Sequence, residues 1–394
     1  MDMIQSREEN GQTVIALSGR ITTANAPEIE TQIREAVERY GLEAVELDCD
    51  GLEYCSSSGL RVILRLKKRI DHTIVVNVHS ELYEIFEMTG FTEMMEIRRA
   101  YRVISLEGCE VLDAGSNGRV YRIDPETIVK AYRQPDALPE IRQEQELARL
   151  AFVAGVPTAI PYDVVRIREG GYGSVFELLN ARGLAKLLAA GEKTLEEVAE
   201  TSVSLLKLIH SREIQSPSLP DMKSKALGWV SYLQEELSGP QLEKLRGLIE
   251  AVPEEDHLLH GDYHIKNVMM QDGEALLIDM DTLCHGHPIF ELGSMYNAYV
   301  GYGLIRQETI REYFGIDPEL CHQLWRRTLE LYLDTEDPAR IRQVEEKAMI
   351  IGLTRIIRRE IRRDGKNRPE GRQMITLCGK RLSELLERVD TLEF

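Results

Sequence analysis

The sequence predicts two consecutive domains, an α/β domain over residues 1–105 and a larger α+β domain over residues 106–394. Strand-like and helix-like segments alternate up to about residue 100. A new set of glycine-punctuated strands then begins at residue 109, and helical periodicity dominates from about residue 195. A length of 394 residues also favours more than one domain.

Each element of the first domain is predicted by the spacing of its apolar residues. Alternation indicates strands over residues 13–21, 44–55 and 72–78. Helical spacing indicates helices over residues 23–41, 57–71 and 81–91, the last of which Gly90 ends. Strands that alternate with helices in this way predict one sheet with helices packed against it.

Composition narrows the classes of function. Hydrophobic residues make up 43% of the chain and charged residues 29%, which is typical of globular proteins. There is no apolar run long enough to span a membrane, and the N-terminal segment is too polar for a signal peptide. Six cysteines without a CxxC pair predict reduced thiols in a cytoplasmic protein. A net charge of −18 disfavours nucleic acid as a partner and suits a cationic substrate or none.

Two short apolar runs in the second domain end in groups that phosphoryl transfer requires. "HLLHGDYHIKNVMM" (257–270) places Asp262 and Asn267 five positions apart, and "LLIDMDT" (276–282) ends in Asp279 and Asp281. A transfer site needs a carboxylate to orient the acceptor hydroxyl, together with amide and carboxylate oxygens that hold Mg²⁺. The protein-kinase loop HRDxxxxN has the same five-residue interval. Polar ends of two hairpin strands are the alternative for each residue alone, and a solvated loop position is favoured for Asp281.

The string HGDxHxxN, followed by an apolar strand that ends in aspartate, resembles the aminoglycoside phosphotransferase and choline kinase family over about residues 108–330. The resemblance implies a two-lobed protein-kinase-like fold, with an N-lobe over residues 106–180 and a helical C-lobe over residues 181–394. It also implies roles for the motif residues. These are Asp262 as catalytic base, Asn267 and Asp279 as Mg²⁺ ligands, and His264 as a structural group that orders the loop.

The other parts of a kinase-like site are expected upstream. Lys130, in the strand "TIVKAY", is where kinases keep the lysine that pairs with ATP phosphates. Glu144 matches the family position that pairs with this lysine, and Glu146 is the alternative. A solvated lysine and surface glutamates are the structural interpretations. The glycine-bearing turn "GSNGRVYRI" (115–123) is expected to bring backbone N–H groups over the phosphates, through Gly115, Ser116, Asn117 and Gly118.

Three further features complete the second domain. Backbone groups of Glu177 and Leu179 are expected to hold the adenine edge, although a plain core strand explains this segment nearly as well. Glu291 stands where the family has an aspartate that braces the catalytic loop, a difference that bears on activity more than on fold. Residues 355–372 carry eight Lys or Arg and three acidic residues. A solvated helix face is the default interpretation, and a surface for a phosphate-bearing ligand or for the first domain is the alternative.

In the first domain, serines precede a helix in "GLEYCSSSGLRVIL" (51–64), where they can cap its N–H groups and where a phosphate would also be stabilised. With "VIALSGRITTANAPEIE" (14–30) and "IFEMTGF" (85–91), this segment resembles the STAS domain, the anti-sigma-factor-antagonist fold. Regulatory members are phosphorylated on the serine of D-S-[ST]-G. Ser57 aligns with that serine, and Ser56 replaces the aspartate before it.

Three functional hypotheses follow. The first is an ATP- and Mg²⁺-dependent phosphotransferase that acts on a hydroxyl of a small molecule and has a regulatory STAS-like domain. The second is a regulatory binding protein that binds nucleotide without catalysis, and the third is a protein kinase. Asp262 favours catalysis, because a nucleotide-binding protein has no need of it. We expect no nucleic-acid or membrane partner. We also expect the STAS-like domain to have a protein partner and to regulate the second domain by contact, with Ser57 as switch.

Overall fold

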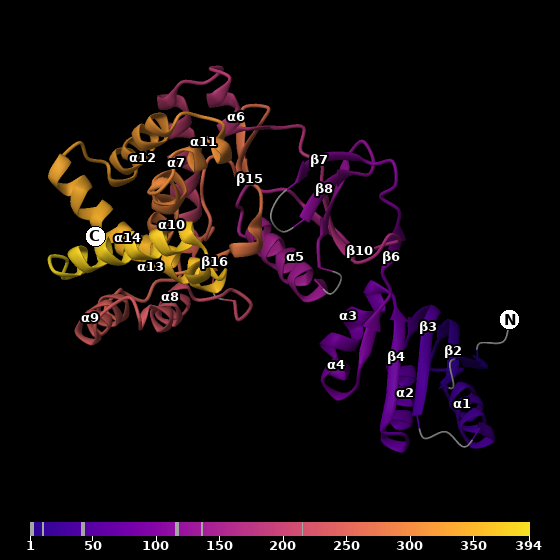
Figure 1. The fold of residues 1–394 in the computed structure, drawn as a ribbon. Helices are drawn as coiled ribbons and strands as arrows, with labels where there is room; N and C mark the ends of the chain where they lie inside the picture. The colour runs from indigo at the N-terminus through magenta and orange to yellow at the C-terminus, as the bar shows by residue number, and fades with distance from the viewer. Residues whose placement is uncertain (1–3, 10–11, 41–43, 115–117, 135–136, 215) are drawn as a thin grey trace. The chain divides into compact units, whose positions relative to one another are not determined.

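The computed structural model describes residues 4–9, 12–40, 44–114, 118–134, 137–214 and 216–394. The chain forms two compact units, which Figure 1 shows in the colours of the sequence. One consists of residues 1–105 and 165–168, and the other of residues 106–164 and 169–394. Of the predicted phosphate-binding turn, Gly115, Ser116 and Asn117 lie outside the described residues, and the predictions for them stay untested.

The first unit has a five-stranded sheet of order β1-β2-β3-β4-β5. Strand β1 is antiparallel to β2, and the remaining neighbours are parallel, as expected when helices connect the strands. Every element predicted from periodicity is present, and β1 and β5 are added at the two edges. The strands are β1 Ile4–Glu9, β2 Gln12–Ile21, β3 Ala44–Cys55, β4 His72–Val78 and β5 Ile97–Arg99. The helices are α1 Ala26–Tyr40, α2 Ser57–Arg69, α3 Ser80–Met88 and α4 Phe91–Met94.

A six-stranded sheet of order β6-β10-β11-β9-β8-β7 comes next along the chain, with helix α5 Leu138–Val153. Strands β7, β8, β9 and β11 are antiparallel to their neighbours. Gly118 lies in this sheet because a Cβ there would come within 2.1 Å of the Ala131 carbonyl oxygen. The strands are β6 Arg102–Ile104, β7 Glu110–Ala114, β8 Gly118–Arg122, β9 Thr127–Tyr132, β10 Pro161–Ile167 and β11 Tyr172–Glu177.

The rest of the chain is mainly helical, and it confirms the predicted α+β, kinase-like fold class. Five short strands lie among the helices: β12 Arg182–Gly183, β13 Leu258–Leu259, β14 Val268–Gln271, β15 Glu274–Leu277 and β16 Cys284–His285. The helices are α6 Leu184–Ala189, α7 Leu195–His210, α8 Met222–Val230, α9 Gly239–Glu250, α10 Ile289–Tyr299, α11 Glu308–Phe314, α12 Pro318–Leu333, α13 Pro338–Arg362 and α14 Pro369–Leu386. Among the described residues, no helix combines the length and the apolar character needed to cross a membrane.

Helices α10 and α13 are held together by glycine contacts. A Cβ on Gly293 would lie 2.6 Å from Cγ2 of Ile351, and one on Gly352 would lie 2.8 Å from the Gly293 carbonyl oxygen. The Asn297 side chain donates a hydrogen bond of 2.9 Å to the Gly352 carbonyl oxygen across the same interface. The two backbones therefore pack at a distance that only glycine permits. This contact fixes α10 and α13 relative to the loop that both helices contact.

Candidate active site

The predicted catalytic residues lie on the loop between β13 and β14. Gly261 adopts a left-handed φ of 79°, and a Cβ there would lie 2.3 Å from the Thr282 carbonyl oxygen. Both observations require glycine at this position, which explains why the motif reads HGD here. Asp262 follows with a side chain that is 44% exposed, as a group that meets a substrate must be.

Glu291 on α10 braces this loop from beneath. Its buried carboxylate accepts hydrogen bonds from the backbone N–H groups of His260 at 2.5 Å, Gly261 at 3.1 Å and Tyr263 at 3.3 Å. Burial raises the pKa of Glu291, but the His210 and His260 rings and the Gly261 N–H outweigh this effect, so the pKa lies below its ordinary value. The longer side chain of glutamate therefore makes the bracing contacts that the sequence left in question.

Asp262 lies in a positive field. Nη2 of Arg355 is 3.8 Å from Oδ1 of Asp262, and Nε2 of His264 is 3.7 Å from Oδ2. Burial raises the pKa of the Asp262 carboxyl, but His264 and Arg355 outweigh burial and hold the pKa well below its usual range. The carboxylate is therefore ionised at neutral pH and can accept a hydrogen bond from a hydroxyl.

Arg355 on α13 was not predicted as a site residue, although it begins the basic segment of the sequence. Its Nη1 donates hydrogen bonds to the Gly261 carbonyl oxygen at 2.7 Å and to Oγ of Ser294 at 2.6 Å. It therefore links both glycine-locked helices to the catalytic loop. No local signal identifies it, because 93 positions separate it from Asp262 (355 − 262).

Two buried histidines order the loop. Nε2 of His264 lies 2.8 Å from the Tyr313 hydroxyl, as expected for the structural role predicted for it. His260 was not predicted. Its Nδ1 accepts a hydrogen bond from the Asp262 N–H at 3.3 Å, and its Nε2 lies 3.0 Å from the Ile278 carbonyl oxygen. His260 thereby ties Asp262 to the run that ends in Asp279.

Lys130 joins two carboxylates from distant parts of the chain. Its Nζ lies 2.5 Å from Oε1 of Glu144 on α5 and 2.6 Å from Oδ1 of Asp279. Burial lowers the pKa of Lys130, but these carboxylates outweigh it and raise the pKa above its ordinary value. The Tyr132 hydroxyl also donates to Glu144, which is 2% exposed, whereas Glu146 is exposed. The structure thus pairs Lys130 with Glu144, and not with the alternative Glu146.

Asn267 and Asp279 lie beside one another, because the Ile278 N–H donates to the Asn267 carbonyl oxygen at 3.0 Å. The Asn267 side-chain NH₂ donates to the Asp262 carbonyl oxygen at 3.1 Å, which orients the amide. Asp279 has a left-handed φ of 68°, an uncommon conformation for a residue other than glycine. Its carboxylate is 42% exposed. An amide oxygen and an accessible carboxylate are suitable donors for Mg²⁺ that also binds nucleotide phosphates.

The predicted adenine-binding segment follows β11. The Glu177 N–H donates to the Ile160 carbonyl oxygen at 3.0 Å, so its own carbonyl is the backbone group it can offer to adenine. Leu179 is half-buried just beyond the strand, and Phe176 packs against the core of the helical part. These positions are compatible with the prediction and do not test it.

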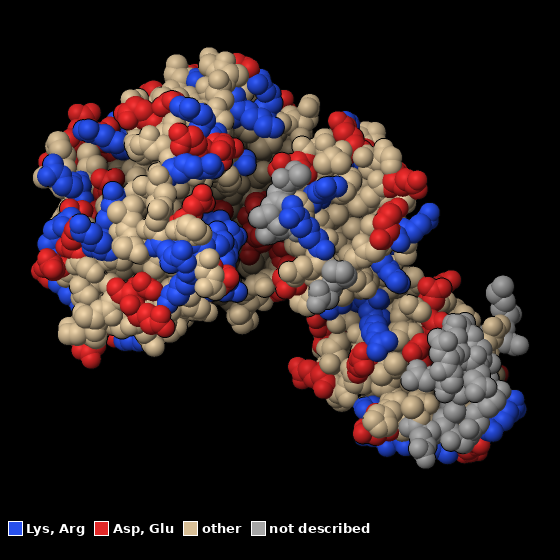
Figure 2. Space-filling view, in the orientation of Figure 1, with Lys and Arg blue, Asp and Glu red and all other residues tan. Residues whose placement is uncertain are grey.

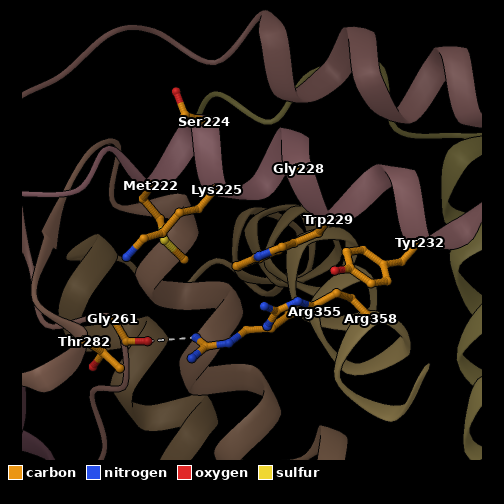
Figure 3. Close-up of a pocket in the computed structure, with 10 residues that line it drawn as sticks. All are labelled: Met222, Ser224, Lys225, Gly228, Trp229, Tyr232, Gly261, Thr282, Arg355 and Arg358. Carbon is orange, nitrogen blue, oxygen red and sulfur yellow. Dashed lines mark hydrogen bonds between the residues drawn. The ribbon is translucent and has the colours of Figure 1, made fainter. Parts of the chain in front are cut away.

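A pocket of about 450 Å³ opens next to the catalytic loop. Figure 3 shows that it lies between α8 and α13, with Gly261 and Thr282 at one end. Sequence analysis found no pattern in α8, since its lining residues are spread at helical spacing without a motif. The residues that matter below are Lys225, Trp229, Tyr232, Gly261, Arg355 and Arg358.

In the first unit, the structure separates the roles of the serines. The Ser56 hydroxyl caps α2 by accepting the Gly59 N–H at 3.4 Å, and its residue is buried. Ser57, the first residue of the helix, is exposed. A Cβ on Gly59 would lie 2.6 Å from Sγ of Cys55, so the glycine of the motif is needed for packing. Ser56 is therefore structural, and the Ser57 hydroxyl is accessible to a modifying enzyme.

Comparisons with known proteins support both resemblances. A family model described as the phosphotransferase enzyme family matches residues 108–331, and the STAS domain model matches residues 3–103. A Bordetella bronchiseptica protein named as an anti-sigma factor antagonist, BtrV, is 29% identical over 92 residues, which are 22% of this chain and 78% of that protein. The anti-sigma F factor antagonist of Paenibacillus polymyxa is 28% identical over 98 residues, which are 24% and 84% of the respective chains.

Two solved structures were compared with the larger part of the chain. A thermostable mutant of aminoglycoside phosphotransferase APH(4)-Ia, in a complex with ADP and hygromycin B, is 14% identical with a TM-score of 0.49. The match covers 71% of this chain and 93% of that one. A choline/ethanolamine kinase family protein from Mesorhizobium loti is 14% identical with a TM-score of 0.48, over 71% of this chain and 88% of that one. Identities this low carry no information about the substrate.

Proposed function

Because the chain belongs to the phosphotransferase enzyme family and carries an N-terminal STAS domain, we propose that it transfers the γ-phosphoryl group of ATP to a hydroxyl of a small molecule. The observation that supports this most is the convergence of four polar side chains from distant segments. Lys130 contacts both Glu144 and Asp279, and the loop that bears Asp262 is hydrogen-bonded to the run that ends in Asp279. A protein that only bound nucleotide would have no need of Asp262.

In the proposed reaction, the acceptor hydroxyl oxygen attacks the γ-phosphorus, and the bond to the β–γ bridging oxygen breaks to release ADP. Asp262 orients the hydroxyl and receives its proton. Lys130, held by Glu144, contacts the phosphate oxygens of ATP. Glu291 and Arg355 position Asp262 through the loop backbone. The protein thus contributes positioning and charge, which are the main requirements of phosphoryl transfer.

Asn267 and Asp279 would hold Mg²⁺. The ion, when bound, neutralises charge on the phosphates. The donor set fits this ion, since both side chains offer oxygen and the nucleotide phosphates would supply further oxygen ligands. Lys130, which pairs with Asp279 in this structure, would exchange that contact for phosphate oxygens.

ATP consumption tests the proposed function. Purified protein with ATP and Mg²⁺ would be given aminoglycosides, choline, ethanolamine, homoserine, sugars, sugar phosphates and nucleosides in turn. At least one compound should accelerate ADP release and should be recovered as its phosphate ester by mass spectrometry. If phosphate appears only on protein side chains, the protein-kinase alternative replaces the proposal.

Asp279→Asn is expected to weaken ATP binding in the presence of Mg²⁺ by about tenfold or more, because a neutral amide is a poor ligand for this ion. Without Mg²⁺ the variant should bind ATP at least as well as the unmodified protein, since one negative charge near the phosphates is removed. Calorimetry with and without Mg²⁺ measures both values. Equal affinities of the two proteins under both conditions would remove Asp279 from the metal site.

The STAS domain suggests regulation by a protein partner, and Ser57 is the position we propose for it. A phosphate on Ser57 would add nearly two negative charges at the N-terminus of α2, where helix N–H groups stabilise them. We expect Ser57→Asp, or removal of residues 1–105, to change turnover on an accepted substrate by about twofold or more, within the usual range of allosteric coupling. Ser58→Asp is the control. Identical kinetics of all proteins, with no phosphate on residues 56–58 by mass spectrometry, would remove the switch.

A further inference from the structure

The pocket beside Asp262 is lined by cations. Arg355 and Arg358 enter it from α13, and Lys225 enters it from α8 (Figure 3). Its residues include no Asp or Glu. Figure 2 shows Lys and Arg side chains gathered over this part of α8 and α13, on a protein whose net charge is −18. The local charge is therefore opposite to the charge of the whole chain.

Two of these cations lack a carboxylate partner. Within the described part of the chain, no Asp or Glu oxygen lies within ion-pair distance of Lys225 or Arg358, and the buried Nε of Arg358 has no hydrogen-bond partner. The carboxylates that flank α8 are already occupied. Asp221 accepts the N–H groups of Lys223 and Ser224 as the cap of the helix, and Glu236 pairs with Lys366 at 3.2 Å.

This arrangement has an electrostatic cost that a ligand would relieve. Burial and the neighbouring Arg362 and Arg355 lower the pKa of Arg358, which shows that its charge is disfavoured where it lies. Proteins seldom leave a half-buried guanidinium unpaired, because desolvating a charge without a partner is unfavourable. An anion in the pocket would supply the partner that the protein does not.

We propose that the acceptor of this phosphotransferase carries an anionic group, a phosphate or a carboxylate, which Arg358 and Lys225 bind while its hydroxyl reaches Asp262. This inference names the substrate class for the proposed function and rests on it. Arg355 lies between the two ends of the substrate, since its Nη2 is 3.8 Å from Asp262 and Arg358 is one helical turn further along α13. A guanidinium binds such oxygens through two parallel hydrogen bonds.

The aromatic walls of the pocket bind the carbon skeleton of such an acceptor. The guanidinium carbon of Arg355 is 5.9 Å from the centre of a Trp229 ring, and that of Arg358 is 6.0 Å from the Tyr232 ring. These contacts hold the arginines extended into the pocket. Cationic acceptors such as amino sugars or choline would meet repulsion from three positive side chains, whereas the overall charge of the chain had favoured them.

A matched set of three-carbon compounds tests the charge preference. Glycerol is neutral, glycerate carries a carboxylate and glycerol 3-phosphate carries a phosphate, while choline supplies a cation. Each is titrated by calorimetry into full-length protein saturated with the ATP analogue AMP-PNP and Mg²⁺, which keeps the phosphates away from the nucleotide site. We expect one of the two anions to bind at least about tenfold more tightly than glycerol or choline, and its affinity to fall as salt is added.

Arg358→Ala and Lys225→Ala should each weaken binding of that anion by about tenfold, and Arg358→Lys should restore part of it. Lys380→Ala on α14 is the matched control, since it removes one positive charge from a side chain that is 76% exposed and lies outside the pocket. AMP-PNP affinity and melting temperature should be the same in all of these proteins. If a variant unfolds, Arg358→Gln replaces it, because it keeps the length and polarity of the side chain.

The outcomes separate this inference from the proposed function. Glycerol or choline binding as well as the anions, no binding of either anion, or equal anion binding by Arg358→Ala and unmodified protein would each overturn the anionic acceptor. Phosphorylation of a neutral or cationic compound in an Asp262-dependent way would then leave the proposed function standing. Anion binding that depends on Arg358, without phosphoryl transfer to any acceptor, would support the pocket and contradict the proposed chemistry.

Discussion

Asp262→Asn is expected to reduce turnover by about a hundredfold or more and to leave ATP affinity nearly unchanged, as for the loss of a general base. Asparagine has the same shape and can still accept a hydrogen bond through its oxygen, but it cannot take the hydroxyl proton. The change also removes the charge that Arg355 and His264 stabilise at 3.8 and 3.7 Å. Its effect on folding should be small, because the side chain is 44% exposed.

Asp272→Asn is the control for this experiment. Asp272 lies exposed in the turn between β14 and β15 with a φ of 51°, a conformation that asparagine also adopts readily. Both variants would be measured for steady-state turnover, for ATP affinity by calorimetry and for melting temperature. Turnover by Asp262→Asn at the level of the control would mean that another group takes the proton, and the proposed role of Asp262 would be wrong.

Glu291→Gln should have the largest effect on stability, with a loss of about 3 kcal/mol or more in the free energy of unfolding. The glutamine NH₂ would face the backbone N–H groups of the loop that now donate to a buried carboxylate. Either some of these donors lose their acceptor, or the loop shifts and displaces Asp262. Turnover should therefore fall with stability. Glu291→Asp should recover part of both, because it keeps the charge on a shorter side chain.

The pH dependence gives a second measurement on Glu291. Its pKa in the folded protein is below the ordinary value, so the unfolded chain binds the proton more tightly. The stabilisation from Glu291 is therefore complete above the unfolded pKa of about 4.3, and it is lost as pH falls through the folded pKa. The difference in unfolding free energy between unmodified protein and Glu291→Gln should narrow below about pH 4. A difference that stays constant on acidification would show that the Glu291 carboxylate is not the source of the stability.

The parts of the site that could be predicted are those that a short stretch of sequence contains. Asp262, His264 and Asn267 share one loop, and Asp279 ends the next run, so spacing alone brings them close together. Lys130 and Glu144 were predicted from family resemblance, and the choice of Glu144 over Glu146 needed coordinates. Periodicity leaves a helix rotation uncertain, and here burial and the contact with Tyr132 settle it.

The pocket could not be predicted, for a physical reason. Lys225 and Arg358 approach each other only because α8 and α13 pack side by side, and their 133 intervening positions (358 − 225) contain no repeat or motif that signals this contact. The basic segment was visible, but its default interpretation as a solvated face is right for Arg362 and wrong for Arg358. In the fold, β1 and β5 were missed because edge strands carry a weaker apolar pattern than central ones.

The glycine contact between α10 and α13 has a consequence for how this protein can change over evolutionary time. Gly293 and Gly352 hold the helix of Glu291 and the helix of Arg355 at a spacing that larger residues would destroy. Mutations on this pair of helices thus put the whole loop at risk, and selection should keep them nearly constant. Helix α8 carries no such obligation, and it still provides Lys225 and Trp229 to the pocket. A laboratory library aimed at a new acceptor should therefore randomise α8 and leave the two glycine-locked helices alone.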